Sequence, residues 1–186
     1  MKATQSLEII ESMLQESKKS LHRNSFYFIL WGLLMVPAGI AESLLIDSPN
    51  FWLIWPIMGI IGGIISMIYG MKEGKRTGTV TSGDRIISYT WGAFVFCLVF
   101  VIVFSLSLRI PPHTLILMLA GMATFISGGI SKFKPFVYGG IAMEIGALAC
   151  AFVVAPEYQG YVSASSLFVG YVIPGFMLKK AEDGQA

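Results

Sequence analysis

The sequence predicts an all-α integral membrane protein, a bundle of six transmembrane helices. The chain has 186 residues, of which 55% are hydrophobic and 13% charged, whereas a soluble domain carries about 25% charged residues. The apolar residues also come in blocks of about 20, the length that crosses a bilayer core as a helix. The six predicted spans are Ser25–Ile46, Phe51–Met71, Arg85–Leu108, Pro112–Ile130, Phe136–Ala155 and Tyr161–Leu178.

Lys and Arg are distributed unequally between the connections. Twelve of the thirteen lie on one side of the predicted membrane, and Arg109 alone lies on the other. Loops that collect Lys and Arg face the cytoplasm, so we expect both termini there. The small loops are typical of a bacterial inner membrane protein, and they are too short to form a nucleic-acid-binding surface.

The first 24 residues form an amphipathic segment, with apolar residues at helical spacing. These are Leu7, Ile10, Leu14 and Leu21. Acidic residues precede basic ones in this segment, an order that complements the helix dipole. We interpret 1–24 as a helix at the cytoplasmic interface, with a short oligomerisation seam as the alternative. Residues 25–180 would then form the transmembrane domain and residues 181–186 a cytoplasmic tail.

A weak threefold repeat favours three consecutive helical hairpins. The odd spans open with the pairs Trp31-Gly32, Trp91-Gly92 and Tyr138-Gly139, and the even spans carry Gly near their basic ends. Each repeat would contain two spans, so all three hairpins would share one orientation. This layout resembles that of small six-span, stress-associated membrane proteins of the HdeD type. Aromatic residues also favour membrane boundaries without any repeat.

Glu144 is the main candidate functional residue. It lies nine residues into the fifth predicted span, where an ionised group costs about 2.5–3.5 kcal/mol on insertion scales. Small residues one turn away, Gly140 and Ala147, indicate that another helix packs beside it. We predict that Glu144 binds a proton or a substrate. The alternative is a buried acid that joins helices through hydrogen bonds.

The sixth span is the most polar, and it supplies further candidates for a transport path. Ser166, Gly170 and Pro174 share one helical face, and Tyr171 adjoins it. Proline removes the backbone hydrogen bond to Gly170 and can kink the helix. With Tyr138 of the fifth span, these residues would line a proton or substrate site, although the same residues also permit close packing.

Small residues on the second span predict a helix-packing surface. These residues are Gly59, Gly63, Ser66 and Gly70. The Gly-x-x-x-Gly spacing allows two helix backbones to approach closely. We expect this surface to join subunits of a homo-oligomer.

Four further polar residues, Glu42, Arg109, His113 and Glu157, are predicted to form a solvated rim at the outer membrane boundary.

The pattern predicts a small multi-pass membrane protein, a proton-coupled transporter or channel for a small solute or ion. The alternative is a non-transporting stress, sensing or accessory protein that binds a partner protein. We expect no enzyme activity, because no catalytic motif is present. We also expect no cofactor and no metal, since Glu144 has no other ligand at its depth. The expected partners are the lipid bilayer, a second copy of the chain, and a small solute or proton.

Overall fold

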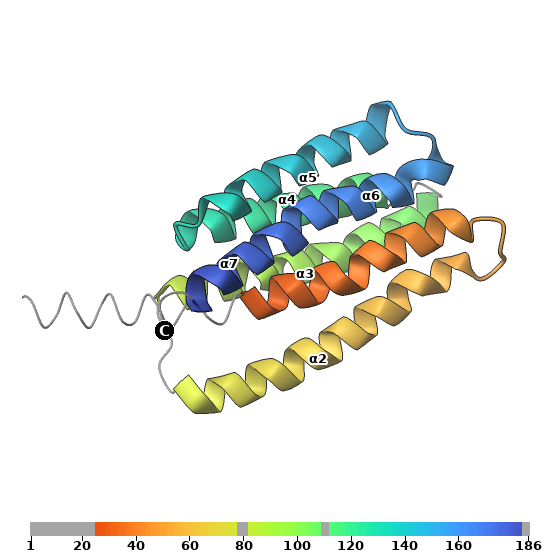
Figure 1. Ribbon diagram of the computed structural model, residues 1–186. Coiled ribbons are helices and arrows are strands. Elements are labelled where there is room, and N and C mark those ends of the chain that lie inside the picture. Colours follow the sequence, from red (N-terminus) through yellow and green to blue (C-terminus); the bar gives the residue numbers. More distant parts are fainter. Residues whose placement is uncertain (1–24, 78–81, 109–111, 184–186) are drawn as a thin grey trace, which may run out of the picture.

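The structure, a computed structural model, describes residues 25–77, 82–108 and 112–183. Within these ranges six helices are long and apolar enough to cross a membrane, and no strand is found. The predicted all-α, six-span bundle is therefore confirmed, and the helices run side by side in Figure 1. The first helix is Ser25–Leu44. The others are α2 (Ile54–Thr77), α3 (Ser82–Leu108), α4 (His113–Ile130), α5 (Lys134–Phe152), α6 (Gln159–Leu167) and α7 (Ile173–Asp183).

Short helical turns precede or interrupt two of the spans. The 3-10 helices η1 (Phe51–Leu53) and η2 (Pro156–Tyr158) come directly before α2 and α6, and the π-helical turn η3 (Phe168–Val172) joins α6 to α7. The sixth span is thus α6, η3 and α7 in sequence. Pro174 is the second residue of α7 and has no N–H group to donate to Gly170, so the hydrogen-bond ladder is interrupted near the position that the proline predicts.

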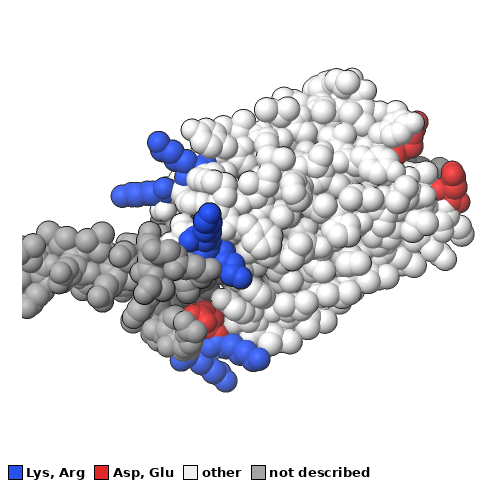
Figure 2. Space-filling view, viewed as in Figure 1, with Lys and Arg blue, Asp and Glu red and all other residues white. Residues whose placement is uncertain are grey.

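Charged side chains lie at the two ends of the bundle and leave an apolar band between them (Figure 2). The end that carries the described Lys and Arg side chains is called the basic end below. Those residues are Lys72, Lys75, Arg85, Lys132, Lys134, Lys179 and Lys180. Large hydrophobic side chains are exposed along the band, so the chain is a multi-pass membrane protein whose surface contacts lipid.

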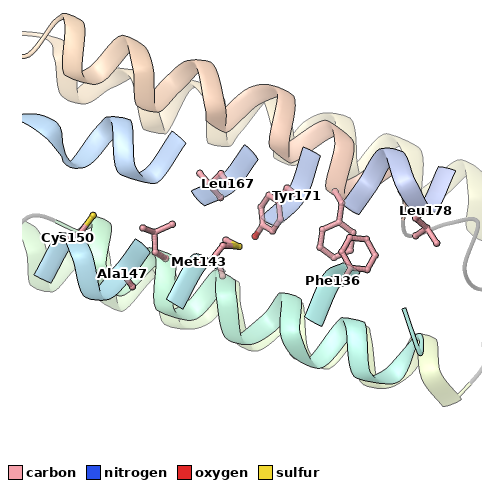
Figure 3. Packing of buried hydrophobic residues seen from close by; sticks show 10 residues of the cluster. Phe136, Met143, Ala147, Cys150, Leu167, Tyr171 and Leu178 are labelled. Atoms are coloured by element: carbon pink, nitrogen blue, oxygen red, sulfur yellow. The ribbon is translucent and has the colours of Figure 1, made fainter. Parts of the chain in front are cut away.

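Four of the six spans form the core. The first helix contributes Phe28, α4 contributes Leu117, and α5 contributes Phe136 and Met143, each at most 5% exposed. Figure 3 shows α5 facing Leu167, Tyr171 and Leu178 of the sixth span. By contrast, only 6% of the apolar windows of α2 and α3 is buried. These two helices therefore lie at the edge of the bundle.

Glycines bring the first helix against the sixth span. A methyl group added to Gly39 would lie 2.6 Å from the carbonyl oxygen of Gly160. A methyl group on Gly32 would likewise lie 2.6 Å from Val172. Any side chain at these positions would push the helices apart, so the small residues set the crossing distance.

α4 and α5 pack closely and are joined by a tight turn. A methyl group on Gly140 would lie 2.7 Å from the carbonyl oxygen of Gly121 and 2.8 Å from the Phe125 nitrogen. In the turn, Lys132 adopts a positive φ of 53°, and the Phe133 N–H donates to the Gly128 carbonyl at 3.0 Å. This is a Schellman motif, in which glycine is the usual residue at the left-handed position. The closest packing thus crosses the boundary between the second and third expected hairpins.

α2 packs mainly on the first helix. Gly62 of α2 lies under Trp31, whose ring would be 2.9 Å from an added methyl group. Near the basic end, Tyr69 of α2 stacks on Phe26 with ring centroids 3.8 Å apart. α2 also continues as a helix through Thr77, because Lys and Glu are good helix formers. The connection between the second and third spans is therefore shorter than the sequence suggests.

Two predicted segments lie wholly or partly outside the described residues. The amphipathic 1–24 segment is outside them, as are the last three residues of the expected 181–186 tail. The first three residues of that tail belong to α7, which ends at Asp183.

Candidate functional site

Glu144 lies near the middle of α5, where a side chain is missing from the neighbouring helix. A methyl group on Gly121 of α4 would lie 2.8 Å from Oε1 of Glu144, so the carboxyl group occupies the space that this glycine leaves. Glu144 is half-buried. In the described part of the chain, no hydrogen-bond donor or basic side chain contacts its carboxyl group. The structure thus provides a carboxyl group in an apolar band without a described protein partner.

The other predicted site residues separate into two groups. Ser166, Gly170 and Tyr171 of the sixth span are buried against α5, where Gly170 meets Gly139 and Met143. The Tyr171 hydroxyl interacts with the side chain of Thr124 of α4. Tyr138, in contrast, is 66% exposed. The structure therefore brings three of the candidates together in the core and leaves Tyr138 on the outer surface of α5.

A second polar cluster lies at the end of the bundle opposite the basic end. His113 Nδ1 lies 3.0 Å from the Ser163 hydroxyl, and His113 Nε2 lies 3.2 Å from Oε1 of Glu42. The indole N–H of Trp55 donates to Oε2 of Glu42 at 2.8 Å. These four residues are called the outer cluster below. They come from four spans: the first helix, α2, α4 and α6.

The outer cluster satisfies its own hydrogen-bonding groups. A carboxylate only accepts hydrogen bonds, so the arrangement places the His113 proton on Nε2, where it donates to Glu42. Nδ1 then accepts from the Ser163 hydroxyl, and Glu42 accepts a second bond from Trp55. Ser163 also interacts with the Cys150 thiol of α5. Such a closed network stabilises the packing of the helices that supply it.

The prediction of a solvated outer rim is wrong for two of its four residues. Glu42 is 8% exposed and His113 is 7% exposed. They are buried because their hydrogen bonds to each other and to Trp55 and Ser163 replace those that water would make. Glu157 is exposed as predicted, and Arg109 lies outside the described residues.

The order Ser163, His113, Glu42 has the connectivity of a nucleophile, base and acid. A catalytic serine must also reach a substrate, and Ser163 is 2% exposed. Two recesses of the described helices lie elsewhere, between α3 and α4, and are lined by apolar side chains such as Phe94, Phe100 and Met118. The geometry therefore supports a structural link between helices more directly than a reaction.

The spacing of buried residues in the first helix and α4 is a sequence signal for the outer cluster. In the first helix, the positions from Ser25 to Glu42 that face the bundle include a series spaced by three and four residues: Ser25, Phe28, Gly32, Met35, Gly39 and Glu42. In α4 the buried face follows the same spacing: His113, Leu117, Ala120, Thr124 and Ser127. Each acid or base therefore continues a small or apolar stripe, which indicates a residue facing a neighbouring helix.

Only part of the predicted packing surface of α2 is in contact with the rest of the chain. A methyl group on Gly70 would lie 2.9 Å from the Tyr27 hydroxyl, so this glycine packs within the chain. No atom lies within 4 Å of a methyl group placed on Gly59 or Gly63. Ser66, which lies between Gly63 and Gly70 in the sequence, is half-buried. Glycines 59 and 63 thus remain open on the surface of α2.

The comparisons with known proteins add no relative. No family model matches the chain, and no curated protein and no solved structure matches it. The resemblance in layout to stress-associated six-span proteins therefore stays a resemblance. The fold defines the class of protein, a six-span α-helical membrane protein. Glu144 and the outer cluster are the features that bear on its function.

Proposed function

We propose that the protein is a small proton-coupled transporter or channel in which Glu144 binds the proton. The observation that carries this proposal is the position of Glu144, half-buried in the apolar band beside Gly121. An acid within a membrane is a functional site by default, because an ionised group there costs several kcal/mol without a partner. Release and uptake of a proton give such a group two states of different charge.

The contacts of Glu144 argue against the alternative role of joining helices. An acid that joins helices does so through hydrogen bonds, each worth about 0.6–2 kcal/mol in membranes. Glu42 has this kind of environment, since it accepts from both Trp55 and His113. Glu144 has no such bond among the described residues. Glu42 and Glu144 are therefore proposed to have different roles, with Glu42 holding the outer ends of the helices and Glu144 free to change its protonation.

The pathway is proposed to run along the α4–α5 side of the bundle. Two recesses between α3 and α4 carry apolar linings, so neither offers a polar route. The open glycines Gly59 and Gly63 of α2 support assembly into a homo-oligomer. The basic end is inferred to face the cytoplasm of a bacterial inner membrane.

The first experiment compares purified wild type, Glu144→Gln and Glu157→Gln across about pH 5–9. Glu157 is exposed in η2, at the start of the sixth span, so its variant controls for the loss of one carboxylate. An ionised Glu144 in apolar surroundings destabilises the fold. The melting temperature of wild type should therefore fall as pH rises, whereas Glu144→Gln should lose this dependence and melt at least as high.

The second experiment measures proton movement in liposomes. An inside-negative potential is imposed on vesicles that contain a pH-sensitive dye. Wild type and Glu157→Gln should acidify the interior faster than Glu144→Gln. If wild type, Glu144→Gln and protein-free vesicles acidify equally, the channel-like form of the proposal is abandoned. If the melting profiles of wild type and Glu144→Gln also coincide, both forms are abandoned.

A second candidate function is an accessory or sensing protein that binds a partner in the membrane. The observation that favours it is the small buried fraction of α2 and α3, which leaves two apolar helices with large exposed surfaces. Under this alternative Glu144 has no role in transport. A Glu144→Gln variant that melts like wild type at every pH, together with a protein recovered by cross-linking through α2, would favour this function.

A further inference from the structure

The surface around Glu144 combines an acid with apolar side chains that face outward. On α5, the residues one turn before and after, Ile141 and Leu148, are 43% and 59% exposed, and the adjacent Ile145 is 62% exposed. On α4, Phe125 lies four residues after Gly121 and is 47% exposed. Residues three and four apart on a helix are neighbours on its surface, so Ile141 and Leu148 border the half-buried carboxyl group.

Phe125 of α4 packs against α5 one turn before Glu144. A methyl group on Gly140, one turn before Glu144, would lie 2.9 Å from Cβ of Phe125. An aromatic face attracts cations. The α4–α5 surface therefore offers three kinds of contact to one ligand: a carboxylate, an aromatic ring and the exposed aliphatic side chains of α5.

The charged groups of the neighbouring elements do not neutralise this acid. The first helix packs on α5 through Phe28 and Phe136. The described titratable residues on the elements packed against α5 are Tyr27 and Glu42 on the first helix, His113 on α4, Tyr161 on α6, Tyr171 on η3, and Lys179 and Lys180 on α7. His113 pairs with Glu42, and Tyr171 interacts with Thr124. Both lysines are at the basic end (Figure 2). On α5 itself, Lys134 is at the basic end, Tyr138 is exposed, and Cys150 interacts with Ser163.

We propose that Glu144 is the counter-ion of a lipid-accessible site on the α4–α5 surface that binds a lipophilic monovalent cation. The inference rests on the proposed function and names its substrate class. A small inorganic cation would have to leave its water to reach the middle of the apolar band, whereas a lipophilic cation partitions there with its charge already shielded. In this low-dielectric setting one opposite charge attracts the ligand strongly.

The cation and the proton compete for one carboxylate. When the cation binds, the O–H bond of the Glu144 carboxyl group breaks, its electron pair stays on the carboxylate, and the proton passes to water. When the cation leaves, the carboxylate takes up a proton again. Affinity for the cation should therefore rise by up to about tenfold per pH unit while Glu144 is mainly protonated.

The test is binding of radiolabelled tetraphenylphosphonium to the full chain in nanodiscs at pH 6 and pH 8.5. Wild type and Glu157→Gln should bind it, more tightly at pH 8.5. Glu144→Gln should bind tetraphenylphosphonium at least tenfold more weakly than wild type, with an affinity that does not change with pH. Glu144→Ala should show the same loss of affinity, and it replaces Glu144→Gln in the test if the Gln variant does not fold. Tetraphenylborate, of the same shape but opposite charge, should not show binding that depends on Glu144.

Several results would overturn the inference. One is equal tetraphenylphosphonium affinity in wild type and Glu144→Gln, and another is Glu144-dependent binding of tetraphenylborate. A third such result would show that a second copy of the chain covers the site. In that case Ile145→Cys would form a disulfide between chains, and wild type would bind no tetraphenylphosphonium.

The outcome separates this inference from the proposed function. If the melting temperature depends on pH through Glu144 but no cation binds, the cation site is wrong and proton binding stands. If the cation binds through Glu144 with equal affinity at both pH values, proton competition is wrong, and the proton-coupled function loses its support.

Discussion

His113 and Glu42 lie 71 positions apart in the sequence, and the Nε2 atom of His113 lies 3.2 Å from Oε1 of Glu42. With Trp55 and Ser163 they form a closed polar network that joins four spans at one end of the bundle. Because the partners are distant in the sequence, this network fixes how helices meet and not how any one of them forms. Its contribution to stability can be measured directly.

Replacing Glu42 with Ala should destabilise the protein. The variant leaves the His113 and Trp55 N–H groups without an acceptor, and each buried donor without a partner costs about 1–3 kcal/mol. The melting temperature in detergent should fall, by about 2–4 °C for each kcal/mol. Glu42→Gln keeps one carbonyl acceptor and should lose less. Glu157→Ala, at an exposed position, should stay close to wild type, and an equal loss in the two Ala variants would contradict the role of the network.

Gly140→Ala should destabilise the α4–α5 contact. The added methyl group would meet the Gly121 carbonyl oxygen at 2.7 Å and the Phe125 nitrogen at 2.8 Å, both backbone atoms. Overpacking of this kind costs about 1–3 kcal/mol, which thermal unfolding would register. Gly63→Ala is the matched control, because its methyl group meets no atom within 4 Å and alanine favours a helix over glycine. A lower melting temperature for Gly63→Ala than for Gly140→Ala would disprove this packing.

Lys132→Gly should stabilise the turn between α4 and α5. Lys132 has a φ of 53°, a left-handed conformation that costs an L-residue about 1–2 kcal/mol and glycine little. The gain is reduced because glycine has more conformational freedom in the unfolded chain. We expect a melting temperature a few degrees above that of wild type. Lys134→Gly, which removes a neighbouring charge at the start of α5, separates the backbone effect from charge and should not stabilise.

The orientation of the bundle predicts which ends react from outside the cell. Glu157→Cys places an exposed thiol in η2 at the start of the sixth span, and Lys75→Cys places one near the end of α2, at the basic end. In intact cells a membrane-impermeant maleimide should label the first variant, and it should label the second only after lysis. Wild type, with Cys97 and Cys150, serves as the blank. The reverse pattern would place the basic end outside.

The sequence alone predicted the number and approximate bounds of the spans and the end at which Lys and Arg gather. It could do so because a bilayer core admits only long apolar helices, and each such block is visible in the local sequence. The sequence also identified Glu144 as an acidic residue in the middle of an apolar span. These properties depend on neighbours along the chain, so no contact between helices is needed to infer them.

Only the tertiary structure decided which faces of the helices meet. A span that is apolar on every side carries little record of its rotation, and so Glu42 and His113 were placed in a solvated rim and not in a buried network. The same uncertainty placed Tyr138 with Tyr171, whereas the structure exposes the first and buries the second. Packing of glycines such as Gly39 against Gly160 and Gly121 against Gly140 sets these rotations, because close contact is possible only where both helices lack side chains.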